Sequence, residues 1–204
     1  MRRLLLACLA SAVSLLAVPA VAADPSAIAF KSDSSGTLPP RVKSSGTVIR
    51  TISWSDGKGD NIAIFSATST SKQKGDITFL TRSIFVDVFA GKDGKLKKVR
   101  TIKEVVSRCE YDISNDFLDT SVGVTDLDNN GIGELTFAYR TACRSDVSPA
   151  DMKVLVLEGG KKYILRGLTS IPGEVENDFK PDFKGAPESF LAHATKVWAK
   201  FKVE

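Results

Sequence analysis

Residues 121–139 read Ser121-Val-Gly-Val-Thr-Asp126-Leu-Asp128-Asn-Asn130-Gly131-Ile132-Gly-Glu134-Leu-Thr-Phe-Ala-Tyr139. A short apolar run stands at each end of this stretch, 121–124 before and 135–139 after, and both runs are typical of β-strands. Neither side of the acidic segment between them shows a helical pattern. The stretch therefore predicts two strands joined by a loop over 126–134.

The loop has the ligand spacing of a hard-cation site. Oxygen-bearing side chains occupy positions 1, 3, 5 and 9, and a glycine occupies position 6, where it permits a sharp bend. The backbone carbonyl at position 7 would complete the set. We therefore predict a structural Ca²⁺ site with these ligands: Asp126, Asp128, Asn130, Glu134 and the carbonyl of Ile132.

The loop differs from an EF-hand, whose position 12 is a bidentate Glu, because position 12 here is Phe137. It looks instead like the short calcium loops between strands of extracellular propeller blades and adhesion modules. Two alternatives stay open. An Asn-Gly turn needs no metal, and three nearby acids either add a ligand or are solvated, namely Asp112, Asp116 and Asp119.

The rest of the chain predicts one antiparallel β-rich domain with a C-terminal amphipathic helix, an α+β fold. The helix is expected over 187–202, and residues 95–106 fit either a strand or a short helix. Lys92-Asp93-Gly94 is typical of a hairpin turn. Other strands are expected at 47–54, 62–65, 77–80, 83–90, 152–157 and 163–165.

The N-terminus has the pattern of a secretory signal peptide. Arg2 and Arg3 precede an apolar run, and a small-residue site predicts cleavage after Ala22 or Ala23. A lipoprotein signal at Cys8 is disfavoured because almost no apolar run precedes it. We therefore divide the chain into a signal peptide (1–23), a flexible leader (24–45) and a single domain (46–204). The mature chain is expected to be periplasmic or secreted and to have no membrane span.

Composition limits the partners. Cleavage removes two arginines and no acids, so the formal net charge falls from +4 to +2. A near-neutral exported chain does not favour nucleic acid. Lysines cluster at 92–98 and 161–162, either as solvated turns or as a surface for an acidic glycan.

Two cysteines remain after loss of the signal peptide, Cys109 and Cys143. An even pair in an exported protein predicts one disulfide. The single histidine, His193, lies far along the chain in the expected helix, so a catalytic cysteine is disfavoured.

Three segments carry a resemblance to a known family: Cys143-Arg-Ser-Asp146-Val-Ser-Pro149, Met152-Lys-Val-Leu-Val-Leu-Glu158-Gly and Lys161-Lys-Tyr163-Ile-Leu-Arg166-Gly167. With the loop before them, they resemble a family of uncharacterised exported bacterial proteins loosely associated with surface polysaccharide. The resemblance covers residues 109–167. It implies export and a common fold, and it supplies no catalytic residues.

The expected function is that of an exported, non-enzymatic cell-envelope module with a calcium loop, whose partner is an envelope glycan or an envelope protein. No local motif selects a catalytic pair of carboxylates. The alternatives are a small hydrolase acting on envelope polysaccharide and a secreted enzyme inhibitor.

Overall fold

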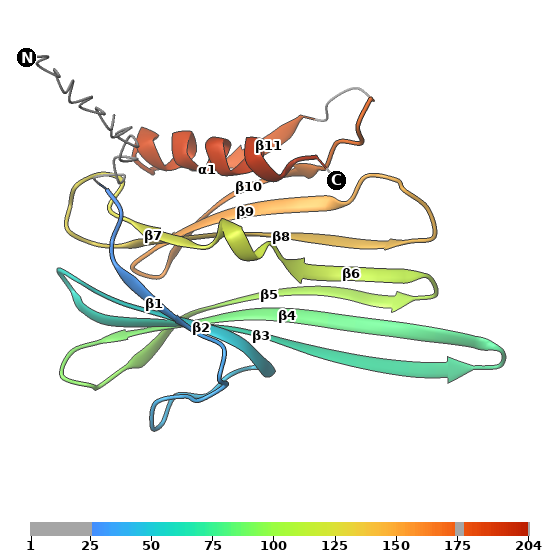
Figure 1. Ribbon diagram of the computed structural model, residues 1–204, viewed down its shortest axis with the longest axis horizontal. Helices are drawn as coiled ribbons and strands as arrows, with labels where there is room; N and C mark the ends of the chain where they lie inside the picture. The colour runs from blue at the N-terminus through green and yellow to red at the C-terminus, as the bar shows by residue number, and fades with distance from the viewer. Residues whose placement is uncertain (1–25, 174–177, 204) are drawn as a thin grey trace, which may run out of the picture.

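The computed structural model describes residues 26–173 and 178–203, which form two antiparallel sheets and one helix. The sheets stack face to face, and the helix lies on the outer face of the second sheet (Figure 1). The fold is therefore α+β and mainly antiparallel β, as the sequence predicts. The expected signal peptide lies outside the described residues.

The first sheet is a meander in chain order. It contains β1 (Phe30–Asp33), β2 (Thr47–Asp56), β3 (Gly59–Lys74), β4 (Ile77–Gly91) and β5 (Lys97–Cys109). Alternate residues of β3 and β4, such as Phe65 and Val86, are buried against the second sheet. The distal half of the β3–β4 hairpin projects beyond the core (Figure 1), so polar residues 69–74 stay in the strand although they bury no apolar face.

The second sheet has the order β11-β10-β9-β8-β6, and β7 also pairs with β8. β8 and β9 are buried on both faces, which explains their nearly continuous apolar sequence. One face meets the first sheet and the other meets the helix. The strands are β6 (Asp112–Phe117), β7 (Gly123–Thr125), β8 (Glu134–Arg144), β9 (Asp151–Glu158), β10 (Lys161–Leu168) and β11 (Phe179–Asp182).

The helix α1 (Glu188–Phe201) begins one residue later than expected, because Pro187 has an extended ψ of 147° and forms its N-cap. Its buried residues Phe190, Ala194 and Trp198 share a cluster with the outward-facing residues of β9 and β10. No helix among the described residues is long and apolar enough to cross a membrane.

A disulfide joins the sheets, as predicted. Cys109 ends β5 and Cys143 lies on β8, and their Cα atoms are 5.5 Å apart. Such a bond is typical of periplasmic or extracellular proteins.

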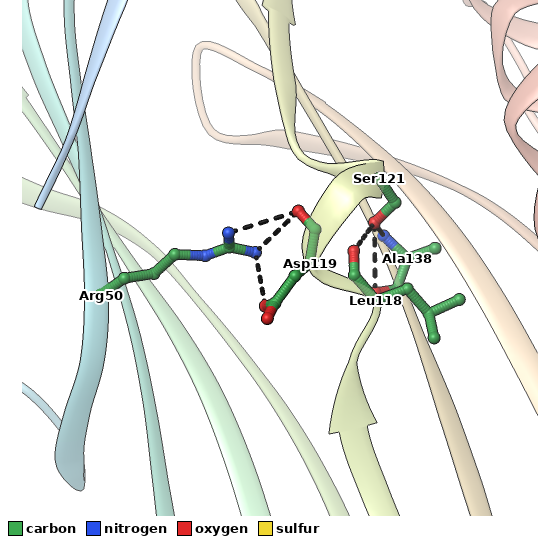
Figure 2. Close-up of polar contacts among 5 residues, drawn as sticks. All are labelled: Arg50, Leu118, Asp119, Ser121 and Ala138. Atoms are coloured by element: carbon green, nitrogen blue, oxygen red, sulfur yellow. Dashed lines mark hydrogen bonds and ion pairs between the residues drawn. The ribbon is translucent and has the colours of Figure 1, made fainter. Parts of the chain in front are cut away.

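A second connection between the sheets comes from Arg50 on β2, shown in Figure 2. Its guanidinium donates to the carbonyl of Asp119 at 3.3 Å and pairs with the Asp119 carboxylate at 3.2 Å. Asp119 begins the short 3-10 turn η1 (Asp119–Ser121) between β6 and β7. Ser121 anchors this turn to β8, because its hydroxyl donates to the Leu118 carbonyl and accepts from the Ala138 amide at 2.7 Å.

The expected leader, 24–45, is part of the domain from residue 26 onward. Residues 30–33 pair with β2, Val42 joins a buried cluster on the outer face of the first sheet, and the Ser45 amide donates to Asp87 at 2.8 Å. The sequence of this segment predicted flexibility because it has few apolar residues. These few are enough to hold it in place, because they pack against the first sheet, which the longer strands already form.

Candidate functional site

The acidic loop joins β7 to β8. These strands pair antiparallel, with Thr125 opposite Glu134, so the two ends of the loop are held next to each other. The pairing brings Asp126, the first residue after β7, close to Glu134, the first residue of β8. Residues at the two ends of the loop therefore lie close together in space.

Three carboxylates converge in this loop. Asp126, Asp128 and Glu134 each place an oxygen so that the three atoms lie within 4.8 Å of one another. This is the one such group of three His, Cys, Asp or Glu side chains in residues 26–173 and 178–203. All three were predicted as ligands.

The loop is held in shape by hydrogen bonds to its backbone and by two residues with left-handed φ angles. The Asp126 carboxylate accepts from the amides of Asn130 at 2.9 Å and Gly131 at 3.0 Å, which closes a tight turn. Asn129 and Gly131 adopt left-handed φ angles of 59° and 77°, and asparagine and glycine tolerate this conformation best. The glycine at position 6 therefore has its expected role.

Glu134 is the most unusual member of the group because it is fully buried. One carboxylate oxygen, Oε2, accepts from the Leu127 amide at 2.6 Å, whereas Oε1 is buried without a hydrogen-bond partner among the described residues. Burial raises the pKa of Glu134 to about 8 against the hydrogen bond from Leu127, with further contributions from the charges of Asp128, Glu158 and Asp126.

The loop rests on the β2–β3 turn of the opposite sheet. Asp56 Oδ2 accepts from the Gly133 amide at 3.1 Å and from Trp54 Nε1 at 3.2 Å. The Gly57 amide donates to the Gly131 carbonyl at 2.7 Å. Gly133 fits closely against this support, since a Cβ there would lie 2.8 Å from Trp54 Nε1.

The side chain of Asn130, a predicted ligand, points its amide nitrogen toward Asp128 and Glu158. Nδ2 donates to Asp128 Oδ2 at 3.1 Å and to Glu158 Oε1 at 2.7 Å, while Oδ1 accepts from the Ile132 amide at 2.8 Å. Ligation by Asn130 and by the Ile132 carbonyl stays a prediction.

The three other acids that the sequence placed nearby do not join the group. Asp116 pairs with Arg82 at 2.5 Å, and Asp119 pairs with Arg50 as Figure 2 shows. Asp112 lies at the start of β6, opposite Arg144. The possibility that one of them supplies a ligand is therefore wrong.

Sequence reasoning missed two residues of the site, Asp56 and Glu158. Asp56 supports the loop from another sheet, and Glu158 contributes a fourth carboxylate through its bond to Asn130. Both come from strand ends far away in sequence, so local spacing gave no signal for them.

Comparisons with protein-family models, curated proteins and solved structures gave no match. The chemistry of the site therefore rests on its own residues. A cluster of oxygen donors without histidine or cysteine suits a hard cation.

Proposed function

We propose that the protein is an exported, non-enzymatic module of the cell envelope in which a Ca²⁺ ion in the loop 126–134 stabilises the end where the two sheets meet. The observation that carries the calcium proposal is the buried Oε1 of Glu134, which has no hydrogen-bond partner among the described residues and belongs to a carboxylate beside two others. A buried, unpaired carboxylate is costly. A divalent cation would neutralise that cost directly.

Calcium is favoured over other divalent ions by the donor set. All expected donors are oxygens, whereas zinc sites use histidine or cysteine. Calcium accepts six to eight oxygens at irregular angles, roughly 2.3–2.6 Å away, and magnesium requires near-octahedral geometry. Asp126, Asp128 and Glu134 would hold the ion with the Ile132 carbonyl, and Asn130 would join them once its amide rotates to present Oδ1.

The ion would act on structure rather than on a reaction. The loop is bonded through Gly131 and Gly133 to the β2–β3 turn, so fixing the loop fixes the contact between the sheets. Export is supported by the disulfide. The link to surface polysaccharide rests on the family resemblance.

The decisive experiment is thermal unfolding of the chain from Ala23 onward after thorough chelation. Adding calcium should raise Tm by mass action, and added magnesium should raise it less. Asp128→Ala should abolish the calcium response while the β-sheet circular dichroism stays intact. A matched control is Asp76→Ala, which removes one carboxylate from the exposed β3–β4 turn.

An unchanged wild-type Tm on addition of calcium would refute the ion site, and the loop would then be only an Asn-Gly turn. Turnover of envelope glycans, or tight binding to a lysozyme or protease, would favour the alternative functions of hydrolase or inhibitor.

A further inference from the structure

A polar groove of about 290 Å³ lies away from the acidic loop, where β5 passes over β9 and β10. β5 is the last strand of the first sheet, so its outer edge has no strand partner among the described residues. The other lining residues come from β8, β9 and β10 of the second sheet. The groove therefore has the edge of one sheet as its wall and the inner face of the other as its floor.

Strand alternation determines which side chains of β10 line the floor. Tyr163 and Leu165 are buried against the helix, so Lys162, Ile164 and Arg166 lie on the opposite face. Ile164 belongs to the core between the sheets, which confirms this direction. The two cations flank it along the strand and line the groove.

The groove has a marked excess of positive charge. Its charged lining consists of a single carboxylate, Glu104, and five cations: Arg100, Lys103, Lys153, Lys162 and Arg166. Lys153 neutralises Glu104 across a 2.5 Å ion pair, and the hydroxyl of Tyr139 also donates to that carboxylate at 2.9 Å. The single acid is therefore already satisfied.

Three of the remaining cations are open to a ligand. The side chain of Lys162 makes no hydrogen bond or ion pair with the described residues, and the side chain of Arg100 bonds only to the Gly160 carbonyl, through Nε at 2.6 Å. Arg166 lies 3.6 Å from Asp182, but both side chains are largely exposed, so this pair is weak. Lys103 is excluded because its ammonium lies over the Phe85 ring, 5.8 Å from the centroid.

We propose that this groove binds an acidic glycan through the carboxylate of a uronate-type sugar unit. The volume is at the lower limit of small-ligand pockets and suits one or two sugar residues. An arginine fork matches a carboxylate in two parallel hydrogen bonds, and Lys162 adds a mobile point charge. Ile102, Leu155 and Ile164 beneath the groove are buried in the core, so the ligand would contact the groove mainly through its polar side chains. The concave shape disfavours a flat lipid surface.

This inference rests on the proposed function in that it names the partner of an envelope module. It does not require the calcium loop, because none of the groove residues belongs to that loop. Failure of one proposal therefore leaves the other standing, and binding measured both with calcium and with chelator separates them.

The test uses trigalacturonate as the probe, titrated into the chain from Ala23 onward by calorimetry at low ionic strength. We expect binding that weakens as salt is added. Lys162→Glu should weaken it about tenfold or more, because an attractive contact becomes a repulsive one. The matched control is Lys161→Glu, the same charge change one residue away on the opposite face of β10.

Amide NMR spectra confirm that each variant is folded and locate the binding to residues 100–104 and 162–166. Arg166→Gln, which removes charge without reversing it, should weaken binding by a smaller factor. The proposal is overturned by absence of trigalacturonate binding, by equal losses in the Lys161 and Lys162 variants, or by equal binding of neutral trigalactose. It is also overturned if anionic phosphatidylglycerol vesicles or inorganic phosphate bind there and trigalacturonate does not.

Discussion

At the scale of single residues, Glu134 decides the chemistry of the loop. Its carboxylate is fully buried, and the charges of Asp126, Asp128 and Glu158 raise its pKa further. A carboxyl group in such a place either keeps its proton and stays neutral, or is ionised and pairs with a cation. Protonation of Glu134 and binding of a cation at the loop should therefore exclude each other, and both can be followed through this one side chain.

The first prediction concerns pH. In chelator, the folded protein holds a proton on Glu134 between pH 4.5 and about 8, whereas the unfolded chain loses it near 4.5. The folded state binds more protons in this window, so the free energy of unfolding should decrease as pH rises through it. Urea unfolding at three pH values measures this. With saturating calcium, the ion replaces the proton, so the free energy of unfolding should change little with pH. In chelator, a free energy of unfolding that does not change with pH would contradict the prediction.

The second prediction concerns Glu134→Gln. The neutral amide keeps the shape and can still accept from the Leu127 amide, but it removes the buried charge. In chelator at pH 8 the variant should be more stable than the wild type by about 1–3 kcal/mol, the range expected for relieving a poorly paired buried group. Its Tm should no longer respond to calcium. If Glu134→Gln is less stable than the wild type in chelator, repulsion among the carboxylates does not destabilise the loop. Glu158→Gln is the control, because it removes a carboxylate at the edge of the group and leaves the buried one in place.

At the scale of elements, the disulfide links the end of β5 to β8 and encloses the whole acidic loop between its two cysteines. The cysteines are 34 residues apart in sequence. Replacing both by serine should lower the free energy of unfolding by about 3–4 kcal/mol, the loop-entropy value for this separation. Urea unfolding of the double variant measures the change. A thiol titration of the unfolded, unreduced wild type should find no free cysteine, and two reactive thiols would refute the pairing.

The elements that sequence reasoning found and missed differ in composition. Alternation within 83–90 and the helical spacing of Phe190, Ala194 and Trp198 are strong signals, since both faces have distinct environments. β6 and β11 were missed because 112–117 is mostly polar and β11 contains Pro181 at a sheet edge, where a missing N–H is tolerated. Residues 95–106 were ambiguous and form β5, which only its pairing with β4 decides.

The residues of the site that lie close together in sequence were predictable. Asp126, Asp128 and Glu134 lie in one loop, so their spacing alone was sufficient to group them. Asp56 and Glu158 were not predictable, because their positions depend on how the two sheets stack. The residues of the basic groove come from four strands, β5, β8, β9 and β10, and only the Lys161–Lys162 pair gave a sequence signal for it.

At the scale of the whole molecule, the two sheets are tied at separate places. The disulfide and the buried Asn115, which donates to the carbonyls of Arg82 and Glu104, hold one end. Arg50 and Asp119 form a further bond between the sheets, which Figure 2 shows. The acidic loop and the β2–β3 turn hold the other end through Gly57, Gly131 and Gly133.

Separate ties predict separate local openings, because stability is not uniform across a structure. Removing calcium should speed hydrogen exchange at the amides of Gly57, Gly131 and Gly133 by about tenfold or more, while the amides around Asn115 keep their protection. Cleaving the disulfide should produce the opposite pattern. Amide exchange measured by NMR with calcium, with chelator and in the Cys109→Ser/Cys143→Ser variant distinguishes the two ends. If calcium changes exchange equally at both ends, the ion acts on global stability and the loop is not an independent tie. Because the described hydrogen bonds from the loop to the first sheet all go to Asp56 and Gly57 at the β2–β3 turn, we expect the change to stay local.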